Sequence, residues 1–223
     1  MVIFEGLSLW GDGGPYFLAF AVMLNWDTRS RAFYYVLFLT ACGFLMNITK
    51  MAYHEPRPFM VTDQIKAYGC SAEYGNPSGH SLFAAAFNFF FFLDLCHGGT
   101  RRSPLVYYSL LTTACVLTIL IGFARFYVGV HTLNQIVYGW QLGLLMAFYF
   151  HLCLRTPVIS HIDEVLARSH GKASYIKFVL VSSIIAAIAF AGQIVTYLVA
   201  QMVIDQGNME KVYYANLALQ ESC

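Results

Sequence analysis

The amino-acid sequence predicts an all-α integral membrane bundle of about six transmembrane helices. Of its 223 residues, 58% are hydrophobic and only 11% are charged, whereas a soluble domain carries roughly 25% charged and about 45–50% apolar residues. The apolar residues form continuous runs rather than alternating patterns, which favours helices over a β-barrel. Because no repeat or low-complexity linker interrupts the chain, we expect residues 1–223 to form a single domain.

Six apolar segments are the expected helices. The first is short and is expected to begin in the interfacial region, whereas the other five approach the 20 or so residues needed to cross a bilayer. In chain order the six segments are Gly14–Trp26, Ala32–Tyr53, Ser81–Cys96, Leu105–Phe123, Leu133–Leu154 and Tyr175–Ile204.

Charge and cysteine content exclude several classes of partner. The formal net charge is +1, and no basic tail or aromatic-basic stripe indicates nucleic-acid binding. No carboxylate cluster suggests a metal site, and no cofactor is expected. The six cysteines show no metal-binding spacing, so most are expected to be small buried thiols, and only Cys70 and Cys223 could meet an oxidising compartment. The lipid bilayer is the expected surrounding, and the oligomeric state is not predicted.

The distribution of Lys and Arg predicts the orientation of the bundle. The positive-inside rule places the larger set of basic residues in the cytosol. Both termini and the loop from Lys50 to Pro77 would then face the other side, with the endoplasmic reticulum as a candidate membrane. The larger set is Arg29, Arg31, Arg101, Arg102, Arg155, Arg168, Lys172 and Lys177, and the smaller is Lys50, Arg57, Lys66, Arg125 and Lys211.

The candidate catalytic and phosphate-binding residues all fall at or next to helix ends. Alternating helix directions bring these ends to one membrane face. The residues are Lys50, Arg57, Ser78, Gly79, His80, Arg125 and His131. Arginine grips phosphate oxygens in a bidentate manner and lysine acts as a point charge. A helix that starts at Ser-Gly offers free backbone N–H groups to an anion. The cluster therefore predicts a phosphate site at one membrane face.

Three short motifs carry a resemblance to a known family. They are KMAYHEPRP (Lys50–Pro58), PSGH (Pro77–His80) and ARFYVGVHTLNQ (Ala124–Gln135). In this order they resemble the signature of the type 2 phosphatidic acid phosphatase and vanadium haloperoxidase superfamily, over a core of about residues 50–154. The segments Glu55–Pro58 and His131–Gly139 are most similar to its dolichyl-diphosphatase branch, and lipid phosphate phosphatases and glucose-6-phosphatase are further members that the chain resembles.

The resemblance implies a role for each site residue. His131 would attack phosphorus and form a phosphohistidine, while His80 would protonate the leaving oxygen and then activate water. The implied phosphate-binding residues are Lys50, Arg57, Ser78, Gly79 and Arg125. The chain departs from the pattern at Ala124, which replaces a serine, and at Gln135, which replaces the aspartate behind the nucleophile. A neutral amide can accept the imidazole hydrogen bond but stabilises an imidazolium less.

The resemblance implies metal-independent hydrolysis of a lipid phosphate or a polyprenyl diphosphate. The alternatives are a sugar-phosphate phosphatase of the same superfamily and a catalytically inactive membrane scaffold that keeps the fold. A transporter ranks last, because the sequence lacks midplane ionisable pairs and broken helices.

Several other polar residues are expected to have no role in the site. Glu55, Asp63 and Glu73 are predicted to be solvated loop residues, with pairing to the site cations as the alternative, and Asp94 is predicted to be hydrated or paired locally. The remaining histidines, including His54, are predicted to be structural.

Overall fold

The computed structural model describes residues 29–62, 64–65, 73–97, 103–168, 172–203 and 216, and these residues form helices and connecting segments without any strand. This confirms the predicted all-α class for the described part of the chain. The first predicted segment, Gly14–Trp26, lies outside the described residues, as do Asp63, Cys70 and Cys223. The helices are α3 (Arg29–Tyr53), α4 (Pro58–Val61), α5 (Gly79–Cys96), α6 (Pro104–Tyr127), α7 (Leu133–Tyr149), the π-helical turn η1 (Phe150–Leu154), α8 (Arg155–Arg168) and α9 (Lys172–Val203).

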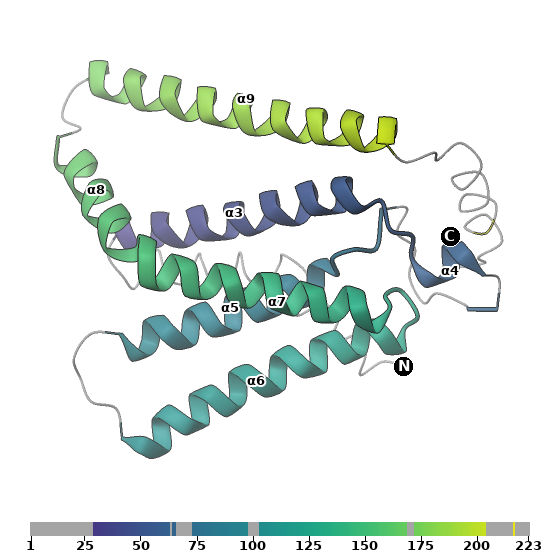
Figure 1. The fold of residues 1–223 in the computed structure, drawn as a ribbon. Helices are drawn as coiled ribbons and strands as arrows, with labels where there is room; N and C mark the ends of the chain where they lie inside the picture. Colours follow the sequence, from purple (N-terminus) through teal and green to yellow (C-terminus); the bar gives the residue numbers. More distant parts are fainter. Residues whose placement is uncertain are drawn as a thin grey trace.

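Among the described residues, four helices are long and apolar enough to cross a membrane, and they lie broadly alongside one another (Figure 1). The spans are Ser30–Val61, Gly79–Cys96, Pro104–Tyr127 and Leu133–Val165. The helix α9 covers the sixth predicted segment, and Ala187–Met202 is a shorter apolar stretch within it. Large apolar side chains such as Leu105, Leu145 and Ile188 are exposed, which suits a surface covered by lipid rather than water.

Aromatic side chains fill the interior between α3, α5 and η1. Phe38 stacks on Phe90 with ring centroids 4.0 Å apart, and Phe150 meets the same Phe38 ring edge-on at 5.2 Å. Tyr34 joins this cluster, and its hydroxyl donates to the Phe150 carbonyl oxygen at 2.6 Å. Buried aromatic pairs in such arrangements contribute specific attraction beyond the area they bury.

Two glycines allow α5 and α7 to approach closely. A Cβ atom at Gly143 would lie 2.4 Å from the Leu82 carbonyl oxygen, and one at Gly139 would lie 2.7 Å from the Ser78 carbonyl oxygen. Small residues commonly permit such backbone approach between membrane helices. Because Gly139 faces the first residues of α5, this contact also fixes the position of the predicted site residues on the two helices.

The fifth predicted segment was too short. Instead of ending at Leu154, the helix passes through the π-helical turn η1 and continues as α8 to Arg168. The α8 segment is more polar than the membrane spans, so hydrophobicity alone gave no reason to extend the helix. A π-helical turn places one extra residue in the helix and changes the direction of the side chains that follow.

The prediction that Asp94 is hydrated or paired locally was wrong. Asp94 is 6% exposed and binds residues on two other elements. Arg31 on α3 donates to Oδ2, Tyr35 donates to the same oxygen at 2.8 Å, and the Arg155 Nε donates to Oδ1 at 3.0 Å. A buried carboxylate requires such partners, because burial of an unpaired charge is costly.

We expect Gly143→Ala to destabilise the bundle by about 1–3 kcal/mol, because the added methyl group would collide with the α5 backbone. Gly192→Ala is the matched control, since a Cβ atom at Gly192 meets nothing within 4 Å. Thermal unfolding of the detergent-solubilised variants measures the difference. Equal melting temperatures for the two variants would contradict a close contact between α5 and α7.

Candidate active site

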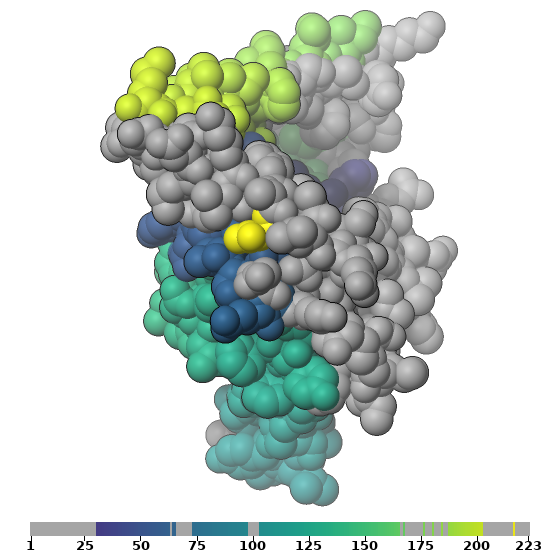
Figure 2. Space-filling view, turned by 90° about the vertical axis from the view of Figure 1, so that its right-hand side faces the viewer, coloured from purple at the N-terminus to yellow at the C-terminus, as the bar shows by residue number. Residues whose placement is uncertain are grey.

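The predicted site residues lie at one end of the bundle, on the right in Figure 1, where α3 and α6 end and α5 and α7 begin. Figure 2 looks onto this end of the molecule. The Asn216 side chain donates to the Met60 carbonyl oxygen at 2.9 Å. Alternating helix directions therefore bring the three motifs together, as the sequence predicted.

His131 lies in the turn between α6 and α7 and is 2% exposed. Its Nε2 atom is 3.2 Å from Arg57 Nη1, and its Nδ1 atom is 3.2 Å from Gln135 Oε1. A guanidinium can only donate hydrogen bonds, so Nε2 must be the unprotonated nitrogen that accepts. The proton then resides on Nδ1 and is donated to the amide oxygen. The nitrogen with a free electron pair consequently faces the cationic side of the site.

The side-chain amide of Gln135 is held in one orientation by its partners. Its Nε2 atom donates to Glu55 Oε1 at 3.1 Å and to the Pro56 carbonyl oxygen at 2.9 Å. On the other side, Oε1 accepts from the Thr132 backbone N–H at 3.2 Å. Two acceptors on one side and a backbone donor on the other exclude the flipped amide. Gln135 therefore presents an oxygen to His131.

The sequence interpretation missed Gly75 and Glu55 as supports of this arrangement. A Cβ atom at Gly75 would lie 2.7 Å from both terminal atoms of the Gln135 amide. The Gly75 N–H also donates to the Glu55 carbonyl oxygen at 2.7 Å. Glu55 was predicted to be a solvated loop residue, but its carboxylate contacts the first turn of α7 instead. Glu55 lies within the first motif, but nothing local to it indicates its contact with Gln135, which is 80 residues away along the chain.

The phosphate-binding cations predicted from the sequence form a partly buried cluster. Lys50 is 8% exposed and Arg57 is 3% exposed. Arg57 is held by hydrogen bonds from Nε to the Glu73 carbonyl oxygen at 2.8 Å and from Nη1 to the Val130 carbonyl oxygen at 3.4 Å. Arg125, in the last turn of α6, is half-buried and lies close enough to act electrostatically on His131.

Glu73 pairs with these cations, which was the alternative to the predicted solvated loop residue. Its carboxylate accepts a hydrogen bond from the Lys50 ammonium and lies 3.9 Å from Arg57 Nη2. The Lys50 hydrogen bond and charge hold the pKa of the Glu73 carboxyl below its usual range, with smaller contributions from Arg57 and His80. The Glu73 side chain is 67% exposed, whereas that of Lys50 is 10% exposed. The solvent-accessible Glu73 carboxylate therefore partly neutralises the buried cations Lys50 and Arg57.

Electrostatics keeps the His131 imidazole neutral. Burial lowers its pKa well below the ordinary value, and the neighbouring charges of Arg57 and Arg125 lower it further. The hydrogen bond to Gln135 acts in the opposite direction. A neutral imidazole keeps an electron pair available for attack on an electrophile.

The PSGH motif opens α5 beside this cluster. Ser78 caps the helix: its Oγ atom accepts from the Ser81 backbone N–H at 3.4 Å and from the Ser81 hydroxyl at 3.0 Å. Because both bonds use lone pairs, the Ser78 hydroxyl proton stays available to a bound anion. Its backbone N–H donates to the Gln135 carbonyl oxygen at 3.0 Å, which ties the starts of α5 and α7 together. Gly79 packs against Met46, and His80 follows, half-buried, in the first turn.

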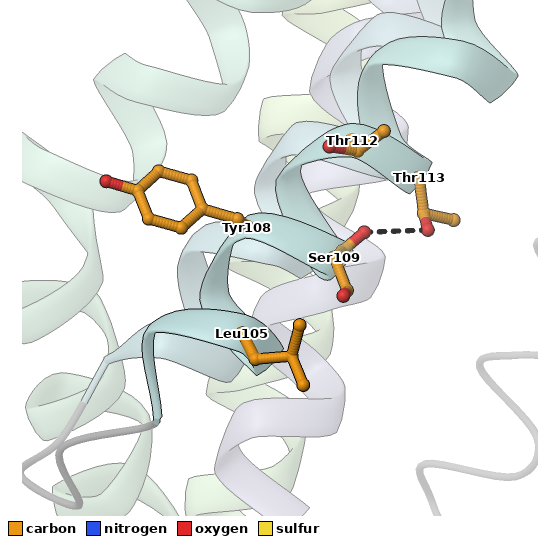
Figure 3. A pocket seen from close by; sticks show the side chains of 5 residues that line it. All are labelled: Leu105, Tyr108, Ser109, Thr112 and Thr113. Atoms are coloured by element: carbon orange, nitrogen blue, oxygen red, sulfur yellow. Dashed lines mark hydrogen bonds between the residues drawn. The ribbon is translucent and has the colours of Figure 1, made fainter.

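Two other features of the described residues provide no competing site. Among the described residues, no three His, Cys, Asp or Glu side chains gather as metal ligands would. A hollow lined by Leu105, Tyr108, Ser109, Thr112 and Thr113 appears in Figure 3. All five belong to the first turns of α6, at the opposite end of that helix from Arg125, and the Thr113 hydroxyl already donates to the Ser109 carbonyl oxygen at 2.8 Å.

Comparison with known proteins identifies relatives for most of the chain. The family model described as the PAP2 superfamily matches residues 31–158, which is more than half of the sequence. A lipid phosphate phosphatase delta from Arabidopsis thaliana is 29% identical over 167 residues. That alignment covers 72% of this chain but only 39% of the plant protein, so the chain spans about two fifths of its relative's length.

A solved structure shares the fold. It is the crystal structure of the first transmembrane PAP2 type phosphatidylglycerolphosphate phosphatase from Bacillus subtilis. The TM-score is 0.56 at 20% sequence identity, and the match covers 75% of this chain and 78% of the bacterial one.

We expect His131 to carry its proton on Nδ1 and to titrate below pH 6.5, because burial and nearby cations disfavour the imidazolium. Arg57→Gln removes a positive neighbour and is expected to raise the His131 pKa, whereas Arg57→Lys keeps the charge and should raise it less. Nitrogen-15 NMR of histidine-labelled protein, with His131→Asn to assign the signal, measures both. A ring protonated on Nε2 at neutral pH would contradict the assigned tautomer.

Proposed function

The chain belongs to the PAP2 superfamily, and from this premise we propose that it hydrolyses a lipid phosphate or a polyprenyl diphosphate through a phosphohistidine at His131. The observation that carries the proposal is the geometry of His131. Its unprotonated Nε2 atom lies 3.2 Å from an arginine nitrogen, and its Nδ1 atom faces an amide oxygen. A nucleophile beside a buried cation is suited to attack a bound phosphate.

In the first step, the electron pair of His131 Nε2 attacks phosphorus and the bond from phosphorus to the leaving oxygen breaks. The His80 imidazolium gives its proton to that oxygen. The leaving group therefore departs as an alcohol from a phosphate ester, or as a protonated phosphate from a diphosphate. The Nδ1 proton stays on His131 throughout and donates to Gln135. Lys50, Arg57 and Arg125 stabilise the charge on the phosphoryl oxygens, together with the Ser78 hydroxyl and the Gly79 amide.

In the second step, water attacks the phosphohistidine. The neutral His80 takes a proton from the water, the bond between phosphorus and Nε2 breaks, and the electron pair returns to His131. Inorganic phosphate leaves, and both histidines recover their starting protonation states. Each atom and proton of the overall hydrolysis is therefore accounted for by the two imidazoles and one water.

Phosphate must displace Glu73 in this mechanism. The Glu73 carboxylate holds the Lys50 ammonium in the absence of substrate, and its side chain is largely exposed. A dianionic phosphoryl group competes well for the same cations, because charge-assisted bonds to phosphate involve more oxygens than a carboxylate offers.

Apolar surface near the site favours a lipid substrate over a sugar phosphate. Phe123, Phe126 and Tyr127 at the end of α6 are exposed, as are Leu133 and Val137 at the start of α7. In a bilayer these side chains face acyl or prenyl chains, so a tail could lie along them while its headgroup reaches His131. The names of both relatives, a lipid phosphate phosphatase and a phosphatidylglycerolphosphate phosphatase, support the same substrate class.

The distribution of basic residues supports a site that faces away from the cytosol, under the positive-inside rule. Arg31 and Arg155 lie together at Asp94, near the opposite helix ends from Lys50 and Arg57. We therefore place the site on the non-cytosolic face, with the endoplasmic reticulum as a candidate membrane and residues 1–223 as one domain.

We expect detergent-purified protein to release phosphate from phosphatidate, phosphatidylglycerol phosphate, sphingoid phosphate or polyprenyl diphosphate faster than from glucose 6-phosphate. His131→Ala should lower kcat at least about 1,000-fold, since it removes the nucleophile. His80→Asn should slow hydrolysis about 100-fold or more, so that labelled phosphohistidine accumulates during the reaction. Quenching without acid preserves this intermediate for detection. Colorimetric phosphate release and phosphorus-32 labelling measure these outcomes.

The control for these variants is His161→Ala, because His161 is an exposed histidine on α8, distant in the fold from the motifs. It is expected to keep full activity. Vanadate should inhibit the reaction and EDTA should leave it unchanged. Preference for glucose 6-phosphate would support the sugar-phosphatase alternative, and absence of phosphate release from every substrate would support a scaffold.

A further inference from the structure

The superfamily pattern would place a carboxylate at position 135, in contact with the histidine. In this chain Glu55 provides a carboxylate that contacts the Gln135 side chain instead. Glu55 Oε1 accepts from Gln135 Nε2 at 3.1 Å, and Gln135 Oε1 faces His131 Nδ1 at 3.2 Å. The three side chains form a continuous series of hydrogen bonds that ends at the unprotonated Nε2 atom. An acidic group therefore lies behind the imidazole, separated from it by a single amide.

The backbone around Glu55 is arranged to hold this position. The chain leaves α3 through His54, a non-glycine residue with φ of 49°, which lies in the sparsely populated left-handed region. The His54 ring is 5% exposed and packs against Tyr74 at 4.4 Å. Uncommon backbone conformations that are held by packing tend to occur at functional sites. This turn directs Glu55 toward the N-terminus of α7.

A second amide contacts the carboxylate from its outer side. Asn134 Nδ2 donates to the same Glu55 Oε1 atom at 3.2 Å, and Asn134 itself is exposed. The N-terminus of α7, with its positive dipole end, stabilises a negative charge at this place. These contacts are also what a carboxylate would make if it only capped α7, so a test must separate the two roles.

We propose that Glu55 is a positioning residue that acts on His131 through Gln135 and supplies the negative charge absent from position 135. The proposal rests on the proposed function and concerns the same site. The Gln135 amide contacts the imidazole directly and orients it, and Glu55 holds the amide. The Glu55 carboxylate polarises that amide, makes its oxygen a stronger acceptor and stabilises the positive charge that His131 acquires when Nε2 binds phosphorus.

The chemistry requires no additional reactant. No proton passes from His131 to Glu55, because Nδ1 keeps its proton and the amide N–H keeps its own. Glu55 contributes only its charge and the orientation it imposes. An effect transmitted through one amide is expected to be smaller than that of a carboxylate in direct contact with histidine.

Glu55→Gln is the first test, with phosphate release measured from the preferred substrate of the wild type. We expect kcat to fall about 10-fold or more, with little change in KM. The acid limb of kcat/KM should move to lower pH, because loss of a negative charge makes His131 harder to protonate. The other charges that act on His131 come from Arg57, Arg125 and Lys50, and they stay in place, as does the Glu73 carboxylate that pairs with Lys50 and Arg57.

Asn134→Ala is the matched control. It removes the other hydrogen bond to the same Glu55 oxygen but leaves the connection through Gln135 to His131 intact. We expect its kcat and pH profile to equal those of the wild type. A fall in kcat as large as that of Glu55→Gln would indicate that Glu55 acts by capping α7.

The combined variant Glu55→Gln/Gln135→Asp exchanges the amide and the carboxylate. It places an acidic group directly behind His131, and the amide at position 55 can donate to it. We expect it to recover part of the activity that Glu55→Gln loses. Gln135→Asp alone should be less active than the combined variant, because two neighbouring carboxylates repel each other.

Two outcomes separate failure of this proposal from failure of the proposed function. If His131→Ala is inactive while Glu55→Gln keeps the wild-type kcat and pH profile, the role of Glu55 is wrong and the mechanism at His131 stands. If the wild type releases no phosphate, the proposed function fails first. In that case the effect of Glu55→Gln on the His131 pKa, measured by nitrogen-15 NMR, still tests the connection: an unchanged pKa would overturn it.

Discussion

The close contact between α5 and α7 is the constraint on which the active-site geometry depends. Gly139 and Gly143 let the two backbones approach until a side chain at either position would collide with α5. At this distance the Ser78 N–H reaches the Gln135 carbonyl oxygen. The start of one helix therefore determines where the start of the other lies. Since Gln135 in turn holds His131, an apolar packing contact inside the membrane sets the position of a histidine at its surface.

The distribution of charge follows from burial of the cations. Lys50 and Arg57 are almost entirely buried, and uncompensated charges at a membrane boundary are costly. Glu73 compensates them from the accessible side, and Glu55 lies behind the neutral pair of His131 and Gln135. A carboxylate at position 135 would raise the His131 pKa, whereas an amide leaves burial and the cations to keep the imidazole neutral. In the proposed mechanism, His131 therefore keeps an available electron pair, and the more distant Glu55 carboxylate stabilises it once it becomes cationic.

The sequence predicted those parts of the structure that depend on local pattern. Hydrophobic runs located α3, α5, α6 and α9 to within a few residues, and the motifs identified Arg57, His131 and Gln135, which the fold brings into contact. The pairings of Asp94 with Arg155 and of Glu55 with Gln135 were not predictable. Their partners lie 61 and 80 residues apart along the chain, and whether two such side chains meet depends on the rotation and depth of each helix. Hydropathy reports neither quantity. Continuation of the helix beyond Leu154 was missed for a related reason: α8 is polar, and packing rather than hydrophobicity determines its extent.

The two charged clusters of the bundle contain similar residues but differ in which sign is buried more deeply. At one end, the buried carboxylate of Asp94 is enclosed by Arg31, Tyr35 and Arg155. Its oxygens are occupied by protein donors, so the cluster joins α3, α5 and α8 and has little capacity for a ligand. At the other end, the cations are buried and their anionic partner Glu73 is exposed. Because the cations are fixed and the exposed Glu73 carboxylate can be displaced, this end is suited to bind an anionic ligand. The location of the negative charge, rather than the number of ion pairs, therefore distinguishes the structural end of this bundle from the end that carries the proposed chemistry.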